Sequence, residues 1–226
     1  MPASLHRRSA WQYGRIWRRW CPEADDGADM SNQSLAEAVR KPNDRRVRRT
    51  RAAIRSAFNA LILSRGYDAI SAADIAEQAN IGRSTFYEHY QSKDDVLAQS
   101  LVALFEPLAG ACLKQPSDQS IASMIQHFWD NRQLGRALMT GRPRTVMARQ
   151  LAGLIERRLD DEPRDGCLVE TTIPIPLLAI QLAQGQLALI EDWLTGRYGC
   201  SATQIAAALR LTSHAAAQSI LVADLK

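Results

Sequence analysis

Apolar residues along the chain recur mainly at the three- and four-residue spacing of amphipathic helices. The clearest pattern begins near Arg45 and ends at Gly66, because glycine readily adopts the left-handed backbone that closes a helix. No segment keeps the two-residue alternation of a β-strand, so the sequence predicts an all-α protein. The apolar stripe of the first helix consists of Ile54, Ala57, Phe58, Leu61 and Ile62.

Two short helices are expected after this first helix. Ser71 is a typical N-cap residue, and Asp74 three positions later suits a capping box, which predicts a helix over 72–79. A tight turn follows at Asn80-Ile81-Gly82, because asparagine tolerates positive φ better than most residues. The second short helix is expected over 83–90.

The rest of the sequence predicts further helices separated by short breaks. Ser92 and Asp95 form a cap pair for a helix over 93–113, which Pro107 should kink because proline lacks the backbone N–H of the helical hydrogen bond. Glycine, proline and polar clusters mark the later breaks. The helices between them are expected over 119–131, 133–140, 144–160, 176–195 and 202–222.

The last two predicted helices carry apolar residues on two sides. Since a surface helix of a monomer needs one apolar face, the second face predicts contact with a twin subunit, and a buried hairpin within a monomer is the alternative. The two sets on the first of these helices are Leu178, Leu182, Leu189 and Trp193, and Ile180, Ala183, Leu187 and Leu194. On the second they are Ile205, Leu209, Ala216 and Ile220, and Ala208, Leu211 and Ala215.

Composition is that of an ordinary soluble protein. Of the 226 residues, 46% are hydrophobic and 23% are charged, which provides enough apolar surface for a core. No run approaches eighteen apolar residues, and the first twenty residues lack the apolar centre of a secretory signal. The four cysteines lie far apart in the sequence, without zinc-site or disulfide spacing. We therefore expect a cytoplasmic protein without membrane span, metal or cofactor.

Basic residues gather near the N-terminus although the net charge is only +4. Such a basic end on a nearly neutral chain is typical of proteins that bind polyanions, and a solvated charged surface is the alternative interpretation. Between residues 40 and 55 the only acid is Asp44, and the basic residues are Arg40, Lys41, Arg45, Arg46, Arg48, Arg49, Arg51 and Arg55.

Residues 1–43 are expected to form a flexible basic extension. Its first part mixes arginine with Trp11, Trp17 and Trp20, a composition that could bind anionic lipid or nucleic acid. Alternatively, residues 1–29 lie upstream of a true start at Met30.

A basic helix followed by two short helices and a tight turn is the layout of a three-helix DNA-binding head. In the second short helix, Phe86 and Tyr90 share one side and should be buried. Hydrogen-bonding groups remain on the outer side, where arginine can bind guanine and serine or threonine can bind several base edges. These outward residues are Arg83, Ser84, Thr85, Tyr87 and His89.

This stretch resembles the head of the TetR family of transcriptional regulators, with a match that covers about residues 45–100. The residues that carry the resemblance are Ile75-Ala76, Thr85-Phe86-Tyr87, His89-Tyr90, Ser92-Lys93-Asp94 and Leu97. The resemblance implies base contacts from Arg83, Ser84 and Thr85, and phosphate contacts from Tyr87, His89 and Lys93. It also implies that the DNA backbone is anchored by Ser71, Arg48, Thr50 and Arg51.

Two positions depart from the family pattern. The family's usual Gly-Val-Ser turn is Asn80-Ile81-Gly82 here, so the second short helix should lack a hydroxyl N-cap. Glu88 places an acid near the expected DNA surface, where it would either accept from cytosine or repel phosphate.

The resemblance implies a helix-turn-helix domain over 44–97 and a helical effector-binding and dimerisation domain over 98–226. Its function would be that of a repressor, homodimeric on double-stranded DNA, which leaves a palindromic operator when a small molecule binds. The alternative is a regulator of the same fold that responds to a protein partner or to no ligand. An enzyme is not expected, because no catalytic triad order, carboxylate pair or phosphate-binding glycine loop is found.

A candidate effector pocket is marked only by apolar side chains, which at helical spacing are more often core residues. Its candidate residues are Met124, Phe128, Trp129, Met139, Met147 and, as a polar contact, Gln181.

Overall fold

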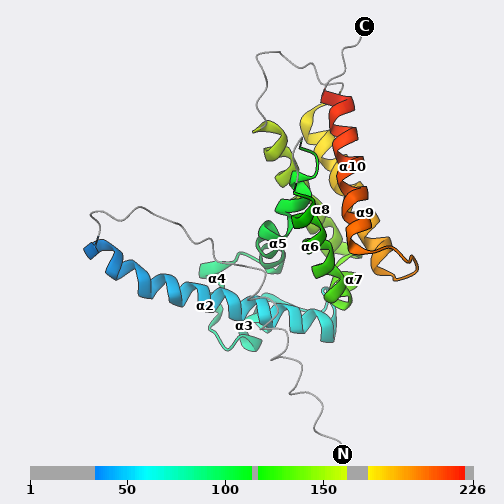
Figure 1. The fold of residues 1–226 in the computed structure, drawn as a ribbon. Coiled ribbons are helices and arrows are strands. Elements are labelled where there is room, and N and C mark those ends of the chain that lie inside the picture. Colours follow the sequence, from blue (N-terminus) through cyan, green and yellow to red (C-terminus); the bar gives the residue numbers. More distant parts are fainter. Residues whose placement is uncertain (1–33, 114–116, 162–172, 222–226) are drawn as a thin grey trace, which may run out of the picture. The chain divides into compact units, whose positions relative to one another are not determined.

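The computed structural model describes residues 34–113, 117–161 and 173–221, with side chains placed from Arg45 onward. Every regular element in these ranges is a helix (Figure 1), which confirms the predicted all-α class. The chain divides into two compact units, Met1–Val96 and Leu97–Lys226. The expectations for residues 1–29 and for a start at Met30 lie outside the described residues.

The first unit holds a long helix, two short helices and the first turn of a fourth. These are α2 (Ser34–Arg65), α3 (Ala72–Gln78), α4 (Arg83–His89) and the start of α5 (Lys93–Gly110). The helix α2 begins well before the predicted start near Arg45. Pro42, Asn43 and Asp44, directly before that point, are poor residues for a helix interior, so the sequence does not predict a helix that continues through them.

The core of the first unit forms where the apolar sides of its helices meet. Ile54 and Phe58 of α2 are fully buried, as are Ile75 of α3 and Phe86 of α4. The ring of Tyr67, in the α2–α3 connection, packs edge-on against Phe58 with centroids 6.0 Å apart. This packing fixes both short helices against the long one.

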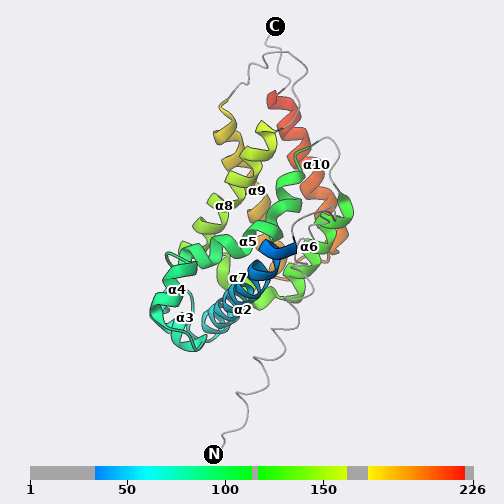
Figure 2. The same cartoon turned by 90° about the vertical axis from the view of Figure 1, so that its left-hand side faces the viewer.

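The second unit is a helical bundle in which α9 lies at the centre of the packing. It contacts both α8 and α10, and Figures 1 and 2 show these three helices side by side. The helices of this unit after α5 are α6 (Asp118–Asp130), α7 (Arg132–Leu138), α8 (Gly141–Asp160), α9 (Ile175–Leu194) and α10 (Ala202–Leu221).

A break is expected at 141–143, between the helices predicted over 133–140 and 144–160, but the structure shows these residues as the first turn of α8. Proline is tolerated there because the first N–H groups of a helix have no helical partner. The break expected after residue 195 is confirmed, since α9 ends at Leu194 and α10 begins at Ala202. Pro107 lies inside α5, as predicted. Among the described residues, no helix is long and apolar enough to cross a membrane.

Three polar side chains are buried in the described part of the second unit, those of His127, Gln186 and Ser213. Gln186 of α9 is 3% exposed, and its amide Nε2 donates to the carbonyl of Leu108 at 3.2 Å and to Ser213 Oγ at 2.9 Å. Because buried polar groups need hydrogen-bond partners, this residue links α5, α9 and α10 in one register.

The two apolar faces predicted for α9 and α10 are distributed differently from expectation. On α9, Ala183, Leu187 and Leu194 were assigned to a second face but are buried within the chain. The reason is that α9 contacts four helices, α6, α7, α8 and α10, so its buried arc is wide. The apolar side chains that remain exposed are Leu177 (52%), Ile180 (50%) and, on α10, Leu211 (56%).

Candidate nucleic-acid interface

The start of α3 is fixed by the predicted capping box. The backbone N–H of Asp74 donates to Ser71 Oγ at 3.2 Å, and the backbone N–H of Ser71 donates to Asp74 Oδ2 at 2.8 Å. Arg65 adds a 2.9 Å ion pair to Asp74 Oδ1. The Ser71 side-chain hydrogen bond, followed by that of Arg65, lowers the pKa of Asp74 to about 2. The Ser71 hydroxyl is thus already engaged inside the head.

The turn between α3 and α4 has the backbone predicted from its sequence. Asn80 has a φ of 55°, in the left-handed region where asparagine is among the tolerated residues. Its N–H donates to the Glu77 carbonyl, and the N–H of Ile81 donates to the Ala76 carbonyl, each at 3.0 Å. Gly82 is the N-cap of α4 and makes no side-chain cap, as expected. The turn therefore holds the two helices in a compact pair.

The helix α4, whose residues are predicted to contact DNA bases, has a buried and an exposed side. Phe86 is fully buried and Tyr90, just after the helix, is 2% exposed, whereas Tyr87 is 59% exposed. Thr85 and His89 are half-buried at the borders. The exposed side consists of Arg83, Ser84, Tyr87 and Glu88. It offers guanidinium, hydroxyl and phenol donors beside one carboxylate, a set suited to base edges and phosphates.

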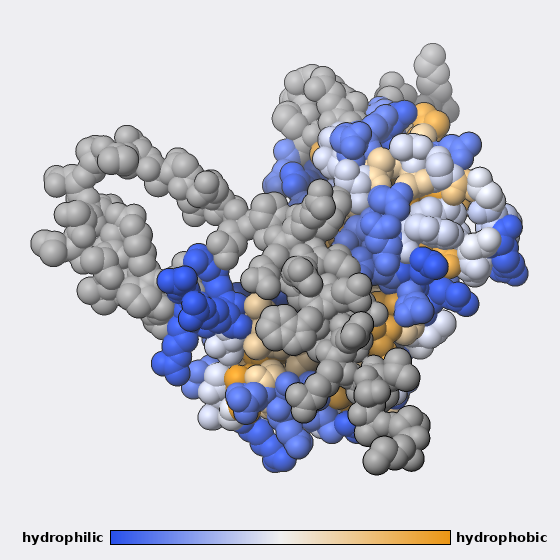
Figure 3. Space-filling model, turned by 60° about the horizontal axis from the view of Figure 1, so that its bottom comes forward, coloured by the Kyte–Doolittle hydropathy of each residue, from blue (hydrophilic) through white to orange (hydrophobic). Residues whose placement is uncertain are grey.

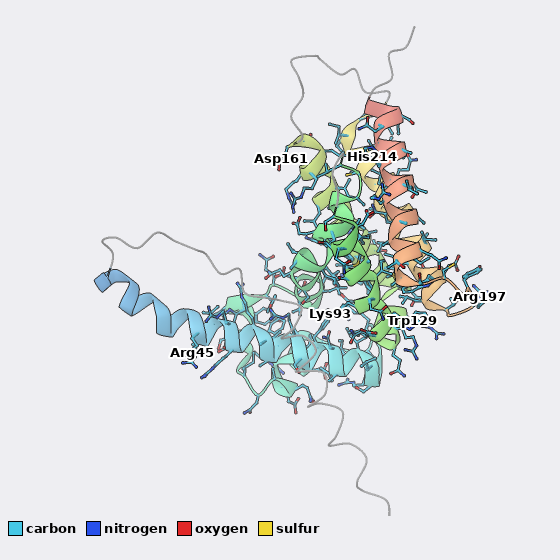
Figure 4. All side chains as sticks on the ribbon, in the orientation of Figure 1. Arg45, Lys93, Trp129, Asp161, Arg197 and His214 are labelled. Carbon is cyan, nitrogen blue, oxygen red and sulfur yellow. The ribbon has the colours of Figure 1, made fainter. Side chains whose placement is uncertain are left out.

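Exposed arginines lie on α2 just before the residues that pack into the core, which begin at Ile54. Arg48 and Arg51 are both exposed, and the half-buried Thr50 donates its hydroxyl to the Arg46 carbonyl at 3.1 Å. Figure 4 labels Arg45 on this stretch, and Figure 3 shows hydrophilic side chains gathered at that end of α2. Such a concentration of cations provides sequence-independent affinity for phosphates.

Lys93, the first residue of α5, is engaged within the head. Its Nζ donates to the backbone carbonyls of Tyr67 and Ile70, each at 2.8 Å. The structure therefore gives its ammonium two partners besides the phosphate that the resemblance implies. Sequence reasoning overlooked Tyr67, although an aromatic residue directly after the helix-ending Gly66 was a visible signal for a buried anchor.

The candidate effector residues belong to the second unit and differ in exposure. Trp129 is half-buried and packs against Trp193 with the ring centroids 4.9 Å apart and the ring planes tilted by 38°. Gln181 lies on the exposed side of α9, whereas the next two residues, Leu182 and Ala183, lie on its buried side. The buried candidates are Met124, Phe128, Met139 and Met147. No cluster of three or more His, Cys, Asp or Glu suited to a metal occurs in the described part of the chain.

Comparisons with known proteins match the head most clearly. Residues 54–99 match the family described as bacterial regulatory proteins, tetR family. The HTH-type transcriptional regulator YxbF of Bacillus subtilis (strain 168), itself uncharacterized, is 45% identical over 58 residues. The aligned region is 25% of this chain and spans only 15% of that relative's length.

A solved structure with a TM-score of 0.50 extends the likeness to the fold of the larger part of the chain. A TetR transcriptional regulator from Streptococcus agalactiae 2603V is 24% identical, with a TM-score of 0.50, over 76% of this chain and 98% of that chain. A TetR-family regulator from Streptomyces coelicolor A3 is 21% identical, with a TM-score of 0.49, over 75% and 95% of the two chains. The predicted resemblance and the helix-turn-helix fold are confirmed.

Proposed function

The chain carries the DNA-binding head of the TetR family of bacterial regulatory proteins, and on that premise we propose that it is a sequence-specific repressor of transcription. In this proposal a homodimer binds a palindromic operator on double-stranded DNA in the cytoplasm and leaves it when a small molecule binds. Its relatives and fold are those of regulators, which normally are not enzymes, so no catalytic step is proposed.

The observation that carries this proposal is the two-sided α4. Its buried side anchors the helix through Phe86, and its exposed side presents Arg83 and Ser84 at the N-terminal end. A recognition helix contacts base edges with its N-terminal residues. We therefore propose that Arg83, Ser84 and Thr85 contact bases, while Tyr87 and His89 contact phosphates.

The arginines of α2 supply the second part of the proposed DNA contact. Arg48 and Arg51 are exposed on the helix that packs against α3, and Thr50 lies between them. We propose that they anchor the DNA backbone while α4 occupies the major groove. The Ser71 hydroxyl has one hydrogen and donates it to Asp74 Oδ2, so a phosphate contact would require that hydrogen to turn to the phosphate while the oxygen still accepts from the Asp74 N–H.

Dimerisation is proposed through the uncovered apolar side of α9 and α10. Ile180 and Leu177 of α9 and Leu211 of α10 each expose about half of their surface. Exposed apolar side chains on neighbouring helices are typical of a surface that a second copy covers. A two-fold dimer would pair two heads with the two halves of a palindrome.

The proposed effector site lies within the second unit, among Met124, Phe128, Trp129 and Met147. These apolar side chains come from α6 and α8 and would suit an apolar or aromatic ligand. Gln181 is exposed, so a role for it would concern the rim of the site or the twin subunit.

The proposal is tested by selecting duplexes from a random DNA library with the wild-type protein. We expect enrichment of a two-fold symmetric sequence, and mobility-shift titration should show tighter binding than to a scrambled duplex of equal composition. Failure to enrich any sequence, with the protein folded and its head exposed, would contradict sequence-specific recognition.

A further inference from the structure

The ammonium group of Lys93 is held on three sides by the connection between α2 and α3. It donates to the carbonyls of Tyr67 and Ile70 at 2.8 Å and lies 4.7 Å from the centroid of the Tyr67 ring. Hydrogen bonds from a charged donor are stronger than neutral ones, and a cation over an aromatic face is further attracted. Two of the three ammonium N–H donors are thereby used inside the protein.

The next residue of α5 contacts the other end of the same aromatic side chain. The hydroxyl of Tyr67 donates to Asp94 Oδ1 at 2.5 Å. Tyr67 itself is only 4% exposed and packs on Phe58 of α2. Two consecutive residues at the start of α5 therefore contact the same buried tyrosine. We call the contacts of Lys93 and Asp94 with Tyr67 and the Ile70 carbonyl the Lys93 clamp.

The position of the clamp in the chain gives it a particular effect. Ile70 directly precedes Ser71, the N-cap of α3, and Lys93 follows α4 after a connection of residues 90–92. The hydrogen bond between them therefore joins the two ends of the segment that contains α3, the turn and α4. Closing a chain segment in this way reduces the number of arrangements open to it.

We propose that Lys93 is a positioning residue that holds α4 in its DNA-reading orientation, and not primarily the phosphate contact that the family resemblance implies. The inference rests on the proposed function. One ammonium N–H is left for other contacts, but the two carbonyls and the Tyr67 ring hold the charge inside the head, and turning it fully outward to a phosphate would lose all three contacts. The exposed arginines of α2 already place cations at the surface of the head for phosphates.

The two roles predict different results for Lys93→Met, which keeps an apolar stem but removes the donors. The probes are the duplex selected by the wild-type chain and its scrambled counterpart, titrated over a salt series. The clamp predicts that the preference between them falls by roughly fivefold or more, the lower end of typical site-to-site couplings. The slope of log affinity against log salt should stay at the wild-type value.

Two further variants separate positioning from charge. Tyr67→Phe removes only the buried hydroxyl, which cannot reach DNA, yet the clamp predicts a smaller loss of preference in the same direction. Arg51→Met removes one exposed cation from α2. It should weaken both duplexes alike and lower the salt slope by about 0.9, the value for one phosphate contact.

The proposal is overturned if Lys93→Met behaves like Arg51→Met and Tyr67→Phe binds as wild type. Its failure is distinguishable from that of the proposed function, because urea unfolding of the full chain needs no DNA. In a double-mutant cycle, Lys93→Met and Tyr67→Leu, which removes the ring beside the ammonium, should be non-additive by at least about twofold in the unfolding equilibrium. Strict additivity there contradicts the clamp even if no duplex is ever selected.

Discussion

Arg83 stands at the exposed start of α4, where its planar guanidinium can bind guanine O6 and N7 together. Replacing it with glutamine should cost about 1–3 kcal/mol of operator binding and relax the preference at one position in each half-site. Binding titrations against operators altered one base pair at a time would measure both effects. Arg149→Gln, at an exposed position on α8, is the matched control and should change neither.

Asp74 links the stability of the head to pH. Its pKa is lowered from 3.8 to about 2 in the folded protein, first by the Ser71 side-chain hydrogen bond and then by Arg65. A lowered pKa stabilises the fold above pH 3.8, and the benefit is lost as the pH falls through about 2. Asp74→Asn should therefore lower the Tm at neutral pH, by an amount that shrinks below about pH 4.

Thermal unfolding of both proteins across this pH range would check the effect. Asp68→Asn, an exposed position in the neighbouring α2–α3 connection, controls for the loss of one negative charge. A Tm difference between wild type and Asp74→Asn that stays constant down to pH 2 would show that the capping box is not its source.

Asn80 provides a test of the turn at the level of the backbone. Because its φ is 55°, alanine at this position would carry the left-handed strain of a residue with a Cβ. Asn80→Ala should cost about 1 kcal/mol of unfolding free energy, whereas Asn80→Gly should stay close to wild type. Urea unfolding of the three proteins measures the difference, and equal stability of both variants would rule out backbone strain as the determinant.

At single residues, local chemistry made much of the head predictable. The Ser71–Asp74 capping box and the positive φ of Asn80 depend on neighbours within three positions, so the sequence contains all of their causes. The contact between Lys93 and Tyr67 could not be predicted from neighbouring residues. It joins residues 26 positions apart, and only the packed head brings them together.

At the scale of the helices, the proposed dimer interface on α9 and α10 can be tested by substitution. Ile180→Glu and Leu211→Glu should each convert a dimer to a monomer, because they place a charge in an interface expected to bury about 1,600 Å². Sedimentation at micromolar concentration would measure the change. Val102→Glu, at a 37% exposed apolar position of α5, is the matched control and should leave the assembly intact.

Ala183 distinguishes dissociation from unfolding. It is fully buried within the chain, so Ala183→Glu should unfold the second unit instead of separating two copies. A folded monomer produced by this variant would mean that α9 presents another face to its twin. A wild-type protein that sediments as a monomer would contradict the dimer itself.

The same helices show where periodicity succeeds and where it fails. From α3 to α10, each helix begins and ends within three residues of its predicted range, because apolar spacing and breakers mark those limits. The start of α2 differs from the prediction, since Pro42, Asn43 and Asp44 argue against a helix that the structure nonetheless continues through them. The faces of α9 were divided wrongly because a sequence cannot reveal that one helix contacts four others.

For the whole molecule, the proposed release from DNA requires that the two units be coupled. The helix α5 belongs to both, since it begins at Lys93 and the division of the chain falls after Val96. A small molecule that binds the second unit should reduce operator affinity by about 5–150-fold, which corresponds to 1–3 kcal/mol. Compounds that raise the Tm of the chain would be tested in operator titrations.

Trp129→Phe offers a check on where such a compound binds. If the proposed lining is correct, this variant should weaken the compound's binding while the compound-free protein keeps its operator affinity. A compound that binds the chain tightly but leaves operator affinity unchanged would favour a regulator that responds to a protein partner or to no ligand.

The Lys93 clamp also turns one amine into a chemical reporter. The whole sequence contains four lysines, and Lys93 is the only one of them in the region matched by the family. An amine held by two carbonyls is protected from acylating reagents and reacts chiefly when those hydrogen bonds open. The rate at which Lys93 is modified, followed by mass spectrometry, therefore reads out the opening of the DNA-binding head in the unaltered protein, without a fluorophore or a second mutation.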